Sequence, residues 1–211
     1  MKKMLFGLIA TVFVNFLGFS QETNLKKAYG EFVKSESYKI TQILIDDYCK
    51  KVNPKNVDLD LSGENDIREW IKKNMDKTSF INYENSVEEY DKVLKSYESM
   101  INENETFFYL LSKSNIDEFK VLITEERKIE LQNTFNSANK VGCVSDCINE
   151  AVSCGKDADD VYAVILGGSA VSWGYGLGFV GSVVTAGGGA IIHHIAQQAC
   201  VRALNGCVRG C

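Results

Sequence analysis

The chain contains 211 residues, of which 45% are hydrophobic and 24% are charged, and its formal net charge is -5. This excess of acidic residues gives no basic footprint for nucleic-acid binding. A chain of this length can bury one ordinary hydrophobic core or two small ones.

The N-terminus has the pattern of an export signal. Lys2 and Lys3 precede an uncharged apolar run, Met4–Phe19, which ends at small residues near Ser20. This pattern predicts a signal peptide at residues 1–20, and the run is too short to favour a permanent membrane span. We therefore expect a secreted, periplasmic or cell-envelope protein, with an uncleaved N-terminal anchor as the alternative.

Charge divides the remaining chain into two unlike parts. Residues 21–140 are dense in Lys, Glu and Asp, whereas the 41 residues between Asp160 and Arg202 include none of these residues and no arginine. We predict an acidic helical domain at 21–140 and a second domain at 141–211. Cleavage after Lys140, at the charge boundary, would release the second domain whole and is a hypothesis.

The acidic part is predicted to be a small helical bundle. It contains one proline, and its apolar residues recur at helical spacing. Helices are expected at about 38–52, 66–76, 105–112 and 116–135. The clearest apolar stripe consists of Val87, Tyr90, Leu94, Tyr97 and Ile101. In the first helix, the residues expected to be buried are Ile40, Ile43, Leu44 and Tyr48.

Between the first two helices, the segment DLDLSGENDIRE resembles an EF-hand calcium loop. Oxygen-bearing residues occupy most of the ligand positions of such a loop, and Gly63 stands at its turn. The candidate calcium ligands are Asp58, Asp60, Ser62, Glu64, Asp66 and Glu69. The alternative is a polar turn that caps the following helix, and no other cofactor is indicated.

Six of the seven cysteines form two sets with mirrored spacing. The first set steps by four and then seven residues, and the second steps by seven and then four. On two antiparallel helices, this mirror places each cysteine opposite a partner and all three on one helix face. In an oxidising compartment disulfides are expected. Of the 15 connectivities available to six cysteines, the nested one uses the symmetry: Cys143–Cys211, Cys147–Cys207 and Cys154–Cys200.

Two other uses of the cysteines are less favoured. A zinc site is disfavoured because His193 and His194 lie outside the cysteine sets, and they are interpreted as polar rim residues. A redox pair is disfavoured because no C-x-x-C motif occurs. The seventh cysteine, Cys49, is predicted to be a small buried hydrophobic residue, with an intermolecular bridge as the alternative.

The cysteine sets enclose a glycine-rich apolar segment, Val161–Ile192, and the mirror centre predicts a turn at Leu177. Each arm would have about 15 uncharged residues, or about 22 Å of helix, which is shorter than a bilayer core of about 30 Å. We therefore expect a hairpin that dips into a membrane or lies on it. The leading contacts would be Trp173, Tyr175, Leu177 and Phe179.

Two alternatives for this segment stay open. It would pack against the charged helical part and never meet lipid, or it would bind a partner protein. Small residues at every fourth position would also allow oligomerisation through the glycine-rich hairpin.

The C-terminal part resembles the halocin-type bacteriocin domains. The residues that carry the resemblance are the Cys143-x3-Cys147 opening, the glycine-rich apolar middle, and the closing AQQACVRALNGCVRGC from Ala196. The resemblance implies a precursor in which an N-terminal partner region precedes a cysteine-rich, antimicrobial domain.

The sequence thus predicts an all-α protein, a helical bundle followed by a disulfide-stapled antiparallel hairpin. Its predicted function is that of a secreted, bacteriocin-like, membrane-active protein whose partner is membrane lipid. The alternative is an envelope structural or binding protein whose hairpin is an interaction arm for another envelope protein. No arrangement of nucleophile, base and orienting acid is visible, so we expect no enzyme.

Overall fold

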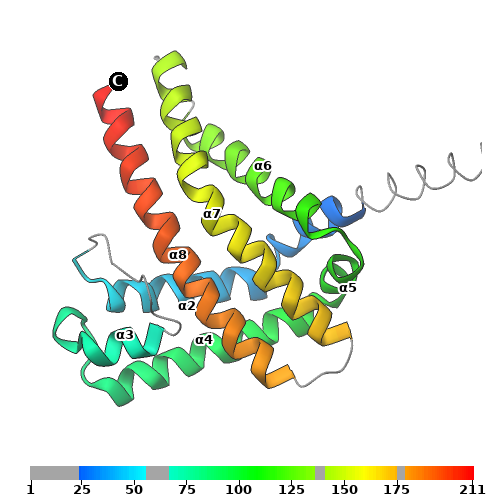
Figure 1. The fold of residues 1–211 in the computed structure, drawn as a ribbon, viewed down its shortest axis with the longest axis vertical. Helices are drawn as coiled ribbons and strands as arrows, with labels where there is room; N and C mark the ends of the chain where they lie inside the picture. Colours follow the sequence, from blue (N-terminus) through cyan, green and yellow to red (C-terminus); the bar gives the residue numbers. More distant parts are fainter. Residues whose placement is uncertain (1–23, 56–66, 136–140, 175–178) are drawn as a thin grey trace, which may run out of the picture.

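The computed structural model describes residues 24–55, 67–135, 141–174 and 179–211 (Figure 1). The side chains of residues 141, 169, 171–174 and 179–187 are outside this description. Regular structure in the described residues is entirely helical. Residues 24–32 are helical, and the later helices are α2 (Glu36–Val52), α3 (Ile67–Lys73), the 3₁₀ helix η1 (Met75–Lys77), α4 (Tyr83–Glu103), α5 (Glu105–Lys113), α6 (Ile116–Phe135), α7 (Val141–Gly174) and α8 (Phe179–Gly210).

Local side-chain chemistry sets several helix ends. The Ser35 hydroxyl accepts a hydrogen bond from the Tyr38 amide at 3.3 Å, and Asn82 Oδ1 accepts one from the Asn85 amide at 2.8 Å. These N-caps satisfy backbone donors that the first turns of α2 and α4 leave open. At the junction of α4 and α5, Asn104 donates its side-chain amide to the Met100 carbonyl at 2.8 Å. The chain therefore begins a new helix there instead of continuing α4.

The helices α2 to α6 lie where the sequence predicts them, with ends that differ by a few residues, whereas the helix at residues 24–32 was not predicted. On α4, the residues Tyr90, Tyr97 and Ile101 of the predicted stripe are buried. On α2 the prediction is confirmed for Tyr48, which is buried, and wrong for Ile40 and Ile43, which are 47% and 60% exposed. The residues that α2 buries are Ser37, Thr41, Ile45, Tyr48, Cys49 and Val52.

Thr41 shares the buried face of α2 with Ile45, Tyr48 and Val52. Its hydroxyl oxygen lies 2.8 Å from that of Ser96 on α4, and it also donates to the Ser37 carbonyl at 2.8 Å. Because its polar group is satisfied, Thr41 occupies the buried face at little cost.

The long helices α7 and α8 lie side by side and run in opposite directions (Figure 1). α7 packs on α5 and α6, whereas α8 packs on α2 and α4. One buried cluster includes residues from the N-terminal helices and from the apolar halves of both long helices, among them Phe32, Tyr97, Phe108, Leu166 and Ile191. The two parts that the charge pattern separates therefore share a core.

The other halves of α7 and α8 project beyond this core and carry three disulfides (Figure 1). The bridges are the three pairs that the mirrored spacing predicts: Cys143–Cys211, Cys147–Cys207 and Cys154–Cys200, with Cα–Cα distances of 5.9, 5.7 and 5.8 Å. A small second cluster lies beside them, built from Val144, Ile148, Ala151 and Leu204 with Leu131 and Phe135 of α6 packed against it.

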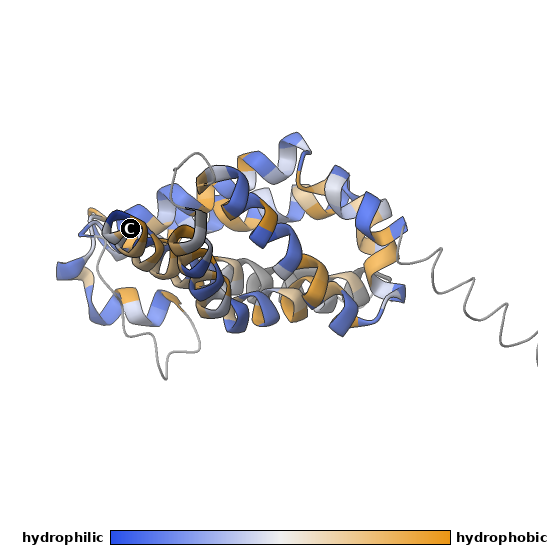
Figure 2. Ribbon diagram, turned by 90° about the horizontal axis from the view of Figure 1, so that it is seen from above, coloured by the Kyte–Doolittle hydropathy of each residue, from blue (hydrophilic) through white to orange (hydrophobic). Residues whose placement is uncertain are grey.

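The outer helices alternate hydrophilic and hydrophobic bands along their length (Figure 2), as amphipathic helices do. Within the described residues, no helix has both the length and the apolar character that a membrane crossing requires. The predicted turn at Leu177 lies outside the described residues, between the end of α7 at Gly174 and the start of α8 at Phe179.

Candidate functional site: a polar cavity beside α6, α7 and α8

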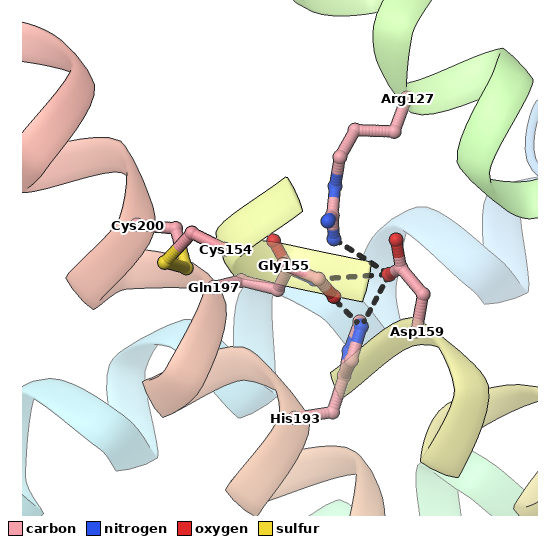
Figure 3. Close-up of a disulfide and its surroundings, with 7 residues drawn as sticks. All are labelled: Arg127, Cys154, Gly155, Asp159, His193, Gln197 and Cys200. Carbon is pink, nitrogen blue, oxygen red and sulfur yellow. Dashed lines mark hydrogen bonds and ion pairs between the residues drawn. A yellow bond between two sulfur atoms is a disulfide. The ribbon is translucent and has the colours of Figure 1, made fainter. Parts of the chain in front are cut away.

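A single buried carboxylate, Asp159 of α7, organises the polar centre of the fold (Figure 3). Its side chain is 1% exposed. Oδ1 lies 2.6 Å from Nη2 of Arg127, 2.9 Å from Nε2 of Gln197 and 3.1 Å from Nε2 of His193. Three helices thus meet at one oxygen atom, because Arg127 belongs to α6 and the other two partners belong to α8.

Arg127 reaches Asp159 because Gly155 leaves room for its guanidinium group. Gly155 stands one turn before Asp159 on α7, and a Cβ atom at this position would overlap the guanidinium. Desolvation lowers the pKa of Arg127, although the neighbouring Asp159 opposes this shift. An arginine stays protonated in such surroundings, so the contact is a buried ion pair.

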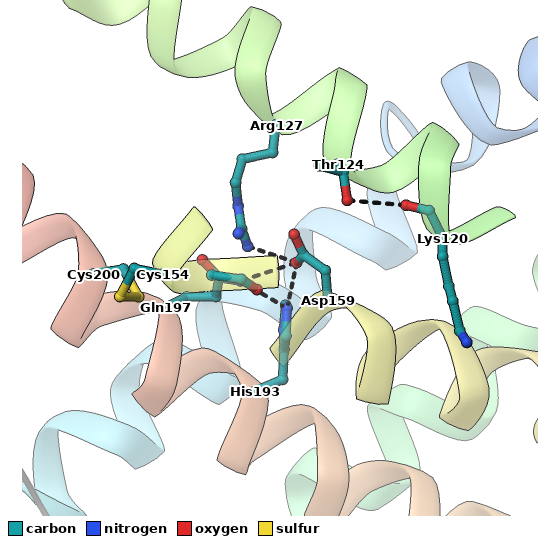
Figure 4. Close-up of polar contacts among 9 residues, drawn as sticks. Lys120, Thr124, Arg127, Cys154, Asp159, His193, Gln197 and Cys200 are labelled. Atoms are coloured by element: carbon teal, nitrogen blue, oxygen red, sulfur yellow. Dashed lines mark hydrogen bonds and ion pairs between the residues drawn. A yellow bond between two sulfur atoms is a disulfide. The ribbon is translucent and has the colours of Figure 1, made fainter. Parts of the chain in front are cut away.

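Arg127 itself is positioned by α6 (Figure 4). In the turn of α6 before Arg127, the Thr124 hydroxyl donates a hydrogen bond to the Lys120 carbonyl at 3.0 Å. The Cys154–Cys200 disulfide lies next to the cluster, because Cys154 immediately precedes Gly155 and Cys200 is three residues after Gln197. The innermost covalent link therefore fixes α7 and α8 at the height of the ion pair.

The motif HHIAQQ of α8 forms two polar clamps that face different helices. His193 and Gln197, one turn apart, both contact Asp159 on α7. The next residues, His194 and Gln198, both contact Oδ1 of Asp46 on α2, each at 3.2 Å. Two His–Gln pairs therefore join α8 to two neighbouring helices, α7 and α2. Both histidines are partly buried, and each has a carboxylate partner.

The second clamp changes the titration of its members. Burial lowers the pKa of His194, and its hydrogen bond to Asp46 offsets part of that shift. Burial raises the pKa of Asp46, but hydrogen bonds from Lys50 and His194 outweigh burial, so the pKa of Asp46 lies below its usual value. His194 is therefore held in its neutral form at neutral pH.

Three residues of the centre bury polar atoms that have no hydrogen-bond partner among the described residues. These atoms are Nη1 of Arg127, Oδ2 of Asp159 and the hydroxyl oxygen of Tyr162. Tyr162 is 6% exposed, and its ring stacks on the His193 ring with 4.4 Å between centroids. Burial raises the pKa of Tyr162 well above its usual value, so its hydroxyl is neutral and able both to donate and to accept.

Asp159 and Tyr162 form part of the wall of a cavity of about 760 Å³. The cavity lies between the end of the first described helix, α2, α6, α7 and α8. Its polar lining comprises Tyr29, Tyr38, Gln42, Glu126, Arg127, Glu130, Asn133, Thr134, Asp159, Tyr162, His193, His194 and Gln197, and its apolar lining is Val33, Ile123 and Ile129. A volume of this size is typical of small-molecule sites, but this wall is more polar than that of most such sites.

The residues that the sequence marks as site candidates lie elsewhere. Glu69, the last candidate calcium ligand, is exposed on α3, and the other five lie outside the described residues. The side chains of the predicted membrane contacts, Trp173, Tyr175, Leu177 and Phe179, also lie outside them. Both interpretations stay predictions.

The sulfur atoms of Cys143, Cys147 and Cys211 lie within 4.8 Å of one another, as metal ligands would. All three cysteines are in disulfides, and a disulfide offers no thiolate to a metal. Cys49 is a buried free cysteine, as predicted, and its sulfur lies 3.8 Å from the Ile191 carbonyl oxygen.

Sequence reasoning missed the cavity because its residues come from five distant segments. A signal was present in HHIAQQ, where two His–Gln pairs at a spacing of four residues indicate a helix with polar groups on two adjacent faces. A second signal was Asp159, an acidic residue at the edge of a long uncharged segment. Neither identifies Arg127 as the partner.

Comparison of the chain with protein-family models, curated proteins and solved structures gives no match.

Proposed function

We propose that this protein is an exported, non-enzymatic binding protein that holds a small hydrogen-bonding molecule in the cavity. The observation that carries the proposal is the set of unpartnered buried atoms at the cavity wall: Arg127 Nη1, Asp159 Oδ2 and the Tyr162 hydroxyl. Leaving such a group without a partner costs about 1–3 kcal/mol. A molecule that supplied hydrogen bonds there would offset this cost.

The disulfides support both export and binding. Bonds of this kind persist in oxidising compartments, in agreement with the predicted signal peptide at 1–20. The Cys154–Cys200 bridge also restrains the two helices that supply Asp159, His193 and Gln197. A wall that is fixed before binding loses little entropy when the ligand arrives.

The test is a thermal-shift screen of the full oxidised chain with small polar molecules of positive, negative and zero charge. We expect at least one class to raise the melting temperature, because ligand that binds only the folded state stabilises it. Tyr162→Phe removes the unpartnered hydroxyl and keeps the ring stack on His193, so it should weaken binding without destabilising the free protein. Tyr109→Phe, at an exposed tyrosine of α5, is the matched control.

The proposal fails if no class of molecule stabilises the wild-type chain. It also fails if every stabilising molecule acts equally on wild type and Tyr162→Phe, since binding would then occur elsewhere.

A membrane-active role for the α7–α8 pair is a second proposal. Val161 and Val164 of α7 are 55% and 54% exposed, and Gly168 continues their helix face into the uncharged segment. This face would meet a membrane or an envelope partner while the opposite face stays in the core. Dye release from anionic and neutral vesicles by the full oxidised chain tests it, with Val161→Ser/Val164→Ser as the comparison. No release at micromolar protein would reject it.

A further inference from the structure

We propose that the ligand of the cavity carries an organic ammonium group. This inference rests on the proposed binding function and adds the chemical class of the ligand. It is argued from the distribution of charge around the cavity, the residues that occupy its one guanidinium, and the aromatic character of its wall.

Acidic groups outnumber permanently cationic ones in the lining. Three carboxylates line the cavity, those of Glu126, Glu130 and Asp159, against the single guanidinium of Arg127. Arg127 and Asp159 neutralise each other at 2.6 Å. Of the remaining two acids, Glu126 has a partly exposed partner in Lys26 at 3.5 Å. Glu130 has no ion pair within the described part of the chain and supplies uncompensated negative charge.

Burial and this negative charge both raise the pKa values of two tyrosines that line the cavity. Burial, with a further contribution from Glu130, raises the pKa of Tyr38 to about 12. Burial and then the neighbouring Tyr38, Asp159, Glu126 and Glu130 raise the pKa of Tyr29 as well. The contribution of the acids to these shifts favours a cation, whereas burial, the larger cause, disfavours a charge of either sign.

Aromatic packing holds these tyrosines in place. The Tyr29 ring meets the Phe119 ring edge-on at 5.6 Å, and the Tyr38 ring meets that of Phe32 at 4.9 Å. Tyrosines that line a cavity attract organic cations through their ring faces. Their neutral hydroxyl groups also accept hydrogen bonds from an ammonium group.

An anionic ligand would meet one permanently cationic group, Arg127, and Asp159 already neutralises its charge through Nη2 at 2.6 Å. The Arg127 side chain is 14% exposed, and its other terminal nitrogen, Nη1, is buried without a hydrogen-bond partner and packs against Gly155. A carboxylate or phosphate that approached it would pass the acids of the wall. His194 adds no positive charge at neutral pH, because burial lowers its pKa.

The experiment uses the full oxidised chain and isothermal titration with matched probes. Butylammonium, tetramethylammonium and putrescine are compared with butanol, butyrate and inorganic phosphate. We expect binding by at least one ammonium probe and none by its neutral or anionic counterpart. Affinity should fall as salt rises, because the attraction is between partly exposed charges.

Two variants of Glu130 sharpen the test. Glu130→Gln should weaken ammonium binding by roughly fivefold, the upper end for a partly exposed ion pair, and Glu130→Lys should weaken it further. Both should fold normally, because Glu130 is exposed. Glu118→Gln changes an exposed acid of the same helix outside the cavity and should leave the affinity unchanged.

The outcomes separate the two proposals. If butanol, butyrate or phosphate binds as tightly as the ammonium probes and Tyr162→Phe weakens it, the cavity is a binding site but the inferred ligand class is wrong. The class is equally wrong if Glu130→Lys leaves ammonium affinity unchanged. If no molecule of any charge binds, in this titration or in the thermal-shift screen, the binding function itself is rejected.

Discussion

The two halves of the α7–α8 pair are held together by different forces. The apolar half, with Leu166 and Ile191, is buried in the core that it shares with the N-terminal helices. The projecting half has only a small cluster around Ile148 and Leu204, and it carries all three disulfides. The disulfides therefore lie in the half of the pair that neighbouring helices bury only slightly. None of the described cysteines forms a disulfide in the half that packs in the shared core.

Reduction of the three disulfides should have the largest effect. Closing even the shortest loop, with a sequence separation of 46, is worth about 4 kcal/mol in the chain-entropy model. We expect the free energy of unfolding to fall by at least about that amount, as measured by urea denaturation of oxidised and reduced protein. Hydrogen exchange should rise first in residues 141–158 and 197–210.

The proposed difference between the two halves would be wrong if, after reduction, hydrogen exchange rose in residues 162–170 and 190–195 before it rose in the stapled ends. It would also be wrong if exchange rose uniformly along both helices. Peptide mapping of the unreduced protein is the accompanying control. It should recover the three nested pairs and leave Cys49 as the only thiol among the cysteines that the structure describes.

Removal of Arg127 should have the second-largest effect, because the Asp159 cluster stands at the junction of the two halves. Arg127→Met leaves a buried carboxylate without its ionic partner, which typically costs about 3–5 kcal/mol. The double variant Arg127→Met/Asp159→Asn removes both charges and should recover much of that loss. Urea denaturation of wild type, Arg127→Met, Asp159→Asn and the double variant measures the coupling, and independent, additive losses would show that no buried ion pair exists.

Truncation of a buried leucine tests the difference in packing directly. Leu166 in the shared core is fully buried, and Leu166→Ala should cost about 3 kcal/mol. Leu204→Ala lies in the smaller cluster between disulfides and should cost less, because the bridges limit unfolding of that half. Val164→Ala, at an exposed position of α7, is the control. Equal losses for the two leucines would contradict the proposed division.

The sequence predicts the stapled half better than the buried half, and the reason is physical. Disulfide pairing depends on spacing along two helices, and spacing is visible in the sequence. Burial of α2 depends on which face meets α4. The face with Ile45, Tyr48 and Val52 is buried, and Thr41 is tolerated there because its hydroxyl is hydrogen-bonded. The Arg127–Asp159 pair depends on contact between distant helices, for which a single sequence carries no local signal.

Acid should weaken the buried half through His194, with the smallest effect of the four. Burial lowers the pKa of His194 below 6.5, so the unfolded chain binds more protons than the folded chain as pH falls. Stability is therefore complete above about pH 6.5 and declines from there through the folded pKa. Urea denaturation between pH 8 and pH 5 should show this decline in wild type and a flatter profile in His194→Gln. Asp46→Asn removes the carboxylate that stabilises the charged imidazole, so its decline should be steeper than that of wild type. Greater stability at pH 5 than at pH 7, or identical profiles in all three proteins, would show that the second clamp does not hold α8 to α2.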